Sequence, residues 1–173
     1  MTDQVLNIIL TRRSVRNFKD ERVPRETLIT LLRAGMNAPS ACNQQPWSFI
    51  AVEDKKILGA LSQVHRGCGA LQKAPLAIAV CGSPNTATLP QFWQQDCAAA
   101  TENILLAAHA LGLGAVWIGV NPASPGDYAA IREILGIPVE VVPFGFIALG
   151  FSAEQRIFED RYDQAKAHLN SAW

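Results

Sequence analysis

The stretch PSACNQQPW at residues 39–47 gives the strongest indication of how this chain folds. Two prolines enclose hydroxyl, thiol and amide side chains, and Trp47 opens the apolar run that follows. Because proline fixes its own backbone angle, the stretch predicts a rigid loop with hydrogen-bonding groups in set positions, followed by a strand over 47–52. Such a loop suits a flat heterocycle with alternating donors and acceptors. The alternative is a solvated connection between two elements.

Helical and strand patterns continue on both sides of this loop. Before it, Leu6, Ile9 and Leu10 mark a short first helix, and apolar residues at helical spacing predict an amphipathic helix over 24–36. After it, strands are predicted over 75–81, 115–120 and 142–149, with helices that begin at Asp54, run over 92–111, and extend from a capping-box-like Ser124 to Gly136.

The C-terminal residues differ in character from the rest of the chain. From residue 152 onward the apolar density falls, yet the chain ends in Trp173, which a free tail has no reason to carry. We therefore predict one layered α+β domain over residues 1–173, in which residues 152–173 form an extended C-terminal arm.

The composition excludes several classes of protein. Hydrophobic residues make up 49% of the 173 residues and charged residues 17%, which is opposite to the balance of disordered chains. Lys and Arg number 15, as do Asp and Glu, so the surplus of cations that nucleic-acid binding needs is missing. Low charge with zero net charge is also a poor composition for a monomer and indicates an oligomer with a large apolar interface.

No signal peptide or membrane span is predicted. The polar, acidic start MTDQ lacks the basic and apolar segments of a signal peptide. The most apolar window, 104–120, contains His109 and two glycines, which favours a buried helix followed by a buried strand. The four cysteines form no C-x-x-C pair, which indicates free thiols in a cytoplasmic protein. A metal site built from them and the three histidines would lack a usual ligand spacing.

Cationic side chains cluster at residues 11–16, TRRSVR. The remainder of the chain is sparsely charged, and this cluster lies between a helix and an extended segment. Several guanidinium forks and a hydroxyl can surround one dianion with bidentate hydrogen bonds, so the cluster suits a phosphate group. The alternative is a solvated basic turn.

A glycine-containing segment, GLGAVWIG at residues 112–119, runs from a helix end into a strand. A dinucleotide fingerprint needs the opposite order, strand then glycines then helix, and no G-x-G-x-x-G occurs in the chain. Gly119 would let a backbone amide approach a ligand closely. Trp117 is interpreted as a core residue and His65 as a surface residue.

Together these segments resemble the nitroreductase family of FMN-dependent oxidoreductases, in family order and over nearly the whole chain. Residues 12–18, RRSVRNF, are similar to the family's R-R-S-x-R-x-F opening, and residues 39–47 to its P-S-x-x-N-x-Q-P-W loop. Residues 112–119 and 148–151 resemble its later signatures, and the segment from Arg161 to Trp173 resembles the C-terminus of its small members. The resemblance implies a central sheet flanked by helices.

The resemblance also implies a cofactor, partners and roles. FMN would be bound and NAD(P)H would be the co-substrate, with a nitroaromatic, quinone or similar small molecule as electron acceptor in a ping-pong mechanism. The enzyme would be a homodimer with FMN at the interface and a C-terminal arm that reaches the partner, without nucleic acid or membrane. No side-chain acid or base is assigned. The implied cofactor-binding residues are Arg12, Arg13, Ser14, Arg16 and Arg161, then Pro39, Ser40, Ala41, Cys42 and Asn43 from the other subunit, and the amides of Ile118 and Gly119.

Other functions remain open from sequence. Relatives of this fold use flavin for reductive dehalogenation, flavin fragmentation or desaturation. A flavin-binding module with little turnover would differ from an enzyme in its steady-state consumption of NAD(P)H. A thiol enzyme built on Cys42 would work without flavin and lose its activity on alkylation.

Overall fold

The computed structural model describes residues 2–121, 123–155, 157 and 159–170, and the predicted role of Trp173 lies outside them. The longer helices and strands are α1 (Thr2–Thr11), α2 (Arg25–Met36), β1 (Trp47–Val52), α3 (Lys55–Ser62), α4 (Gly69–Lys73), β2 (Leu76–Gly82), α5 (Trp93–Ala110), β3 (Gly114–Gly119), α6 (Pro125–Leu135) and β4 (Val142–Gly150).

The four strands form one antiparallel sheet in the order β1-β2-β4-β3. The inner strand β2 is buried at every position, which explains why its sequence is a continuous apolar run rather than an alternating one. β3 is an edge strand, and among the described residues its outer edge is paired near its start, where Ser14 bridges to Ala115.

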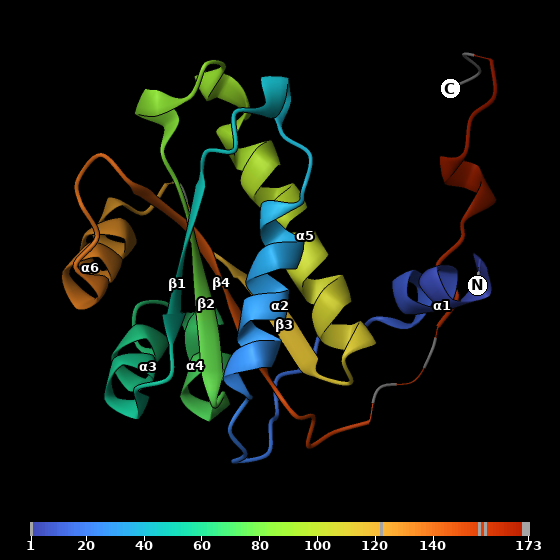
Figure 1. Cartoon of the computed structure of the whole chain (residues 1–173), viewed down its shortest axis with the longest axis horizontal. Helices are drawn as coiled ribbons and strands as arrows, with labels where there is room; N and C mark the ends of the chain where they lie inside the picture. Colours follow the sequence, from blue (N-terminus) through green and yellow to red (C-terminus); the bar gives the residue numbers. More distant parts are fainter. Residues whose placement is uncertain (1, 122, 156, 158, 171–173) are drawn as a thin grey trace.

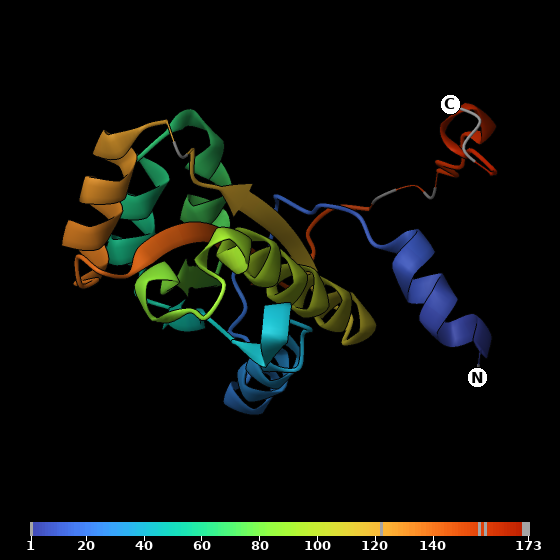
Figure 2. The ribbon, with the colours of Figure 1, turned by 90° about the horizontal axis from the view of Figure 1, so that it is seen from above.

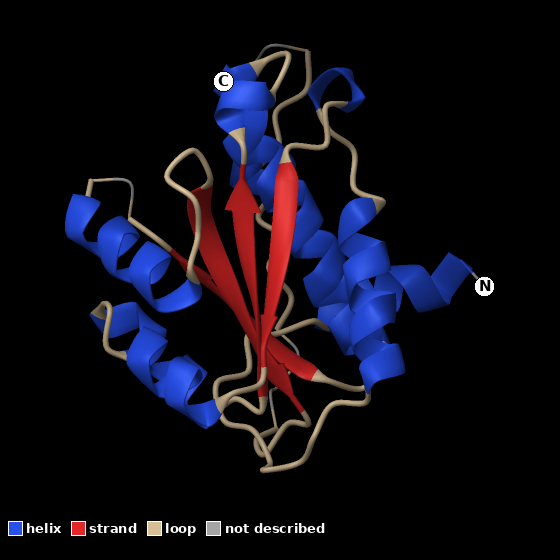
Figure 3. Ribbon diagram, turned by 60° about the vertical axis from the view of Figure 1, so that its left-hand side comes forward, coloured by secondary structure: helices blue, strands red, loops and turns tan. Residues whose placement is uncertain are grey.

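Helices cover both faces of the sheet, so the predicted layered α+β architecture is confirmed (Figure 3). On one face α2 and α5 bury Leu31 and Ile104 against the sheet. On the other face α3, α4 and α6 bury Leu61, Leu71 and Ile131.

Most residues that the sequence predicts to begin or end a helix do so in the structure, and two local predictions fail. Asp54 caps α3 by accepting from the N–H of Lys56 and Ile57, and Gly136 ends α6 with a φ of 64°. Ser124, in contrast, makes no side-chain capping hydrogen bond to α6, so the capping-box prediction is wrong. The short helix α4 was not predicted, because it begins at a glycine and has only five residues, too few to show helical periodicity.

The N-terminal helix and the C-terminal segment lie apart from the sheet and its covering helices (Figure 2). Four of the five large apolar side chains of α1 are between 50% and 62% exposed, and Ile8 is partly buried: the exposed four are Val5, Leu6, Ile9 and Leu10. The described residues of the arm are exposed from residue 159 onward. None of the described helices has the length and hydrophobicity that crossing a membrane requires.

Candidate functional site

The outer edge of β3 is where the candidate site is built. The N–H of Val15 donates to the carbonyl of Ala115 at 3.0 Å, so main-chain groups of Ala115 face this edge. Alternation along a strand then directs the N–H of Gly119 to the same edge and that of Ile118 to β4. This corrects one detail of the sequence reading, because only one of the two predicted amides faces outward.

Five of the predicted residues surround one polar pocket of about 260 Å³: Arg12, Arg13, Ser14, Arg16 and Arg161. The bridge from Ser14 to Ala115 holds the first four beside the start of β3, and Arg161 comes from the C-terminal arm. The Arg12 guanidinium is anchored by an ion pair with Glu102 at 3.2 Å. The pocket therefore gathers guanidinium groups around a hydroxyl, a donor set that suits a phosphate dianion.

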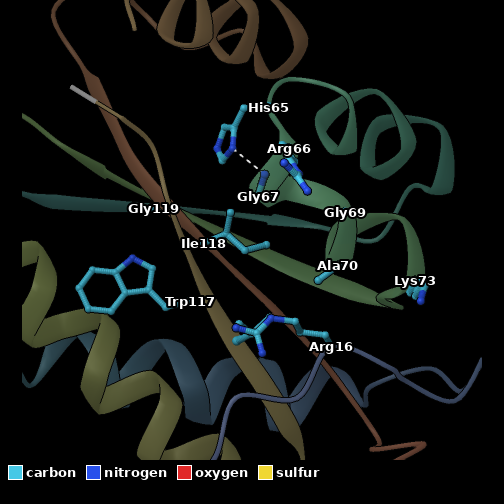
Figure 4. Close-up of a pocket in the computed structure, with 11 residues that line it drawn as sticks. Arg16, His65, Arg66, Gly67, Gly69, Ala70, Lys73, Trp117, Ile118 and Gly119 are labelled. Carbon is cyan, nitrogen blue, oxygen red and sulfur yellow. Dashed lines mark hydrogen bonds between the residues drawn. The ribbon is translucent and has the colours of Figure 1, made fainter. Parts of the chain in front are cut away.

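A second, larger pocket of about 620 Å³ adjoins the first through Arg16, which lines both. Figure 4 shows Arg16 and Lys73 on one side of Ile118 and His65 on the other. Residues 116–119 of β3 form one wall, and six residues of the segment 65–73 form another: His65, Arg66, Gly67, Gly69, Ala70 and Lys73.

Three polar residues of this pocket were missed by the sequence reading: Lys73, Arg66 and His65. They lie on or beside α4, and that helix was not predicted. His65 is not a simple surface residue: its Nδ1 accepts from the N–H of Gly67 at 3.0 Å, and its Nε2 is buried without a partner among the described residues.

Trp117 is not a core residue, contrary to the sequence reading. Its side chain is 37% exposed and lies between the large pocket and a smaller aromatic one, which Trp93, Tyr128 and Phe144 also line. Its ring centroid lies 5.5 Å from that of Phe144. It is therefore placed to contact a ligand at the edge of β3.

The predicted loop residues Pro39, Ser40, Ala41, Cys42 and Asn43 lie elsewhere. Ser14 pairs with Ala115, which pairs with Leu149 of β4. Leu149 in turn pairs with Leu76, the first residue of β2. Trp47, where the loop ends, pairs with Gly82, at the other end of β2. Within one chain, the loop and the arginine pocket therefore occupy opposite ends of the sheet.

Burial determines the electrostatics of the thiols and of His109. Burial raises the pKa of Cys68 and Cys81 to about 11 and that of Cys97 to about 12, which makes them poor nucleophiles. Burial and the nearby guanidinium groups of Arg12 and Arg13 lower the pKa of His109. Among the described residues, no three His, Cys, Asp or Glu side chains lie close enough to share a metal ion.

Several known proteins are similar to this chain in sequence and in fold. A curated protein of Methanothermobacter thermautotrophicus, provisionally named an NADH dehydrogenase/NAD(P)H nitroreductase, is 44% identical over 95% of this chain and 86% of its own. An FMN-dependent nitroreductase of Clostridium difficile is 34% identical, with a TM-score of 0.89 over 95% of this chain and 98% of that one. A provisionally named nitroreductase of Desulfovibrio desulfuricans, solved in complex with FMN, is 30% identical with a TM-score of 0.82, and the match covers 98% of this chain and 97% of that one.

The family follows from the sequence and the fold together. The arginine motif, the loop at 39–47 and the glycine segment occur in the expected order, and the sheet carries them on the fold of these relatives. The sequence model of the Nitroreductase family matches residues 9–83 and 62–151. The chain belongs to the Nitroreductase family, and its relatives in that family include proteins named as NAD(P)H nitroreductases and as an NAD(P)H-dependent FMN reductase.

Proposed function

We propose that the protein is an FMN-dependent oxidoreductase that takes electrons from NAD(P)H and passes them to a nitroaromatic, quinone or similar small acceptor. The observation that carries this proposal is the junction at Arg16, where the arginine pocket meets the larger pocket at the edge of β3. A ligand with a dianionic end and a flat polar end fits this pair of pockets. FMN has both ends.

The residues around the two pockets fit FMN in their chemistry. Arg12, Ser14 and Arg161 would hold the phosphate with charge-assisted hydrogen bonds. Arg13, whose terminal nitrogens donate to the carbonyls of Leu10, Arg12 and Glu159, would add its charge beside them. Bound FMN supplies two-electron redox chemistry, accepting a hydride from the nicotinamide and releasing the electrons to the acceptor.

Positive charge and a backbone donor would orient the flat end. Arg16, Arg66 and Lys73 place three cations at the large pocket, and these would stabilise negative charge that develops on a ligand there. The outward N–H of Gly119 adds a fixed donor on the wall that β3 forms. Trp117, beside it, would offer an apolar ring to the flat end of the ligand.

We also propose a homodimer in which the loop at 39–43 meets the FMN held by the other subunit. Two features support it: the loop lies at the opposite end of the sheet from the arginine pocket, and α1 exposes an apolar face that a second copy would cover. The C-terminal arm would reach the partner. The four free cysteines support a reducing, cytoplasmic location.

Purified protein is expected to show the visible bands of oxidised flavin and ping-pong kinetics. Donor and acceptor would stack in turn on the same exposed face, so double-reciprocal plots for the acceptor at several NAD(P)H concentrations should be parallel. Intersecting lines would argue for a separate nicotinamide site. Cys42→Ser serves as the control and should retain most of the activity, since the proposed reaction needs no thiol. If this variant binds FMN but is inactive, the alternative of an enzyme whose nucleophile is the Cys42 thiol would be favoured.

The dimer is expected to persist until the protein unfolds, because each FMN site needs both chains. Light scattering at micromolar concentration should give a mass near twice 18.8 kDa. A particle of 18.8 kDa that holds FMN and turns over NAD(P)H would contradict the shared site.

A further inference from the structure

A buried carboxylate anchors the loop at residues 39–45 to α5. Asp96 lies in the first turn of α5 and is only 4% exposed. Its Oδ1 accepts from the N–H of Ala41 at 2.9 Å, and its Oδ2 accepts from the Gln44 amide at 2.5 Å. None of the ion pairs in the described part of the chain includes Asp96. Donors from the loop therefore occupy both carboxylate oxygens of this buried side chain.

The side chain of Gln44 can adopt only one orientation in this arrangement. Its Nε2 also donates to the carbonyl of Leu89 at 3.1 Å, while its Oε1 accepts from the N–H of Leu89 at 2.8 Å. Exchanging the two ends of the amide would place oxygen against oxygen and N–H against N–H at Leu89. Gln44 therefore presents a donor to Asp96 and cannot present an acceptor.

The loop that Asp96 holds has an unusual backbone. Cys42, Asn43 and Gln45 have φ values of 49°, 56° and 47°, in the left-handed region that residues other than glycine seldom adopt. Inside the loop, the hydroxyl of Ser40 accepts from the N–H of Gln45 at 3.0 Å. The bonds to Asp96 fix this conformation to the rest of the fold from outside the loop.

We infer that Asp96 is a positioning residue of the flavin site. Through Ala41 and Gln44 it keeps residues 39–43 in the conformation in which they meet FMN. The inference rests on the proposed function, in which this loop contacts the cofactor held by the other subunit. Asp96 itself lies outside the segments 12–18, 39–47, 112–119, 148–151 and 161–173, on which the family resemblance rests.

Asp96→Asn is the first test, because it keeps the shape and replaces one acceptor by a donor. The amide cannot accept from both Ala41 and Gln44, and Gln44 cannot turn to compensate. We expect the Kd for FMN, measured by quenching of flavin fluorescence, to rise about tenfold. In the apoprotein, hydrogen exchange should accelerate in the peptide covering residues 39–46.

Exchanging the carboxylate and the amide between positions 96 and 44 tests whether the hydrogen bond between these two side chains holds the loop. Gln44→Glu alone would bring two carboxylates together and should weaken FMN binding more than Asp96→Asn does. In the double variant with Asp96→Asn, the new amide donates to the new carboxylate and still accepts from Ala41. The double variant should therefore bind FMN more tightly than Gln44→Glu alone; equal or weaker binding would overturn the inference.

Thr101→Val is the matched control, since Thr101 is also buried in α5 but, among the described residues, its hydroxyl bonds within the helix, to the carbonyl of Cys97. It should lower the Tm without changing the FMN Kd or the loop's exchange rate. If Asp96→Asn behaves in the same way, Asp96 is merely structural and the inference is wrong. A wild-type protein that binds no FMN would instead overturn the proposed function and this inference with it.

Discussion

Replacing Arg16 with alanine is expected to weaken FMN binding about 10- to 150-fold, with little change in the stability of the fold. Arg16 lines both pockets, so its guanidinium is placed to contact the phosphate end and the flat end of the same ligand. Hydrogen bonds to charged groups contribute about 1.5–3 kcal/mol each, which gives this range. Titration of the apoprotein with FMN, followed by flavin fluorescence, measures the effect.

Two further variants make this result specific. Arg22→Ala removes an exposed guanidinium that pairs with Glu53 at 3.3 Å and lines neither pocket, so FMN affinity should not change. Arg16→Lys keeps the charge but loses the planar fork, and should bind FMN with an intermediate affinity. An Arg16→Ala variant that purifies fully yellow with unchanged affinity would show that the arginine pocket does not hold FMN.

The strands could be predicted because their signals are local. Apolar runs bounded by prolines or glycines place β1 at the predicted residues and β2 within one residue of its predicted ends. The arginine cluster could be predicted for the same reason, since four of its members lie within five residues of sequence. Its assembly with Arg161 came from the family resemblance, because nothing local links the arm to residue 12.

The residues that were missed depend on contacts between distant segments. Asp96 lies 55 residues from Ala41, and no motif marks it. Lys73 lines the large pocket because α4 faces β3 across it, and α4 has only five residues, too few to show helical periodicity. The left-handed backbone at Cys42 could not be expected either, since sequence patterns assign that conformation to glycine first.

Gly119→Ala is expected to leave the fold intact and to lower FMN affinity about tenfold or more. A Cβ at this position would meet no atom within 4 Å, so the free energy of unfolding should stay equal or rise by up to about 1 kcal/mol. The methyl group would occupy space where the two pockets beside Trp117 meet, and Gly119 lines both. The N–H proposed to face the flavin would then be harder for the ligand to reach.

Gly145→Ala is the informative counterpart, because Gly145 pairs with Gly119 from the neighbouring strand. Its Cβ would lie 2.7 Å from the carbonyl oxygen of Ile118, a backbone atom that can move only if β3 shifts. We expect a cost of about 1–3 kcal/mol in unfolding free energy, together with weaker FMN binding. Thermal unfolding measures the stability of the fold, which should fall only in Gly145→Ala. Titration with FMN measures the affinity for the cofactor, which should fall in both variants. If Gly119→Ala binds FMN as tightly as the wild type does, the flavin does not approach the outer edge of β3, and the site must be placed elsewhere on the sheet.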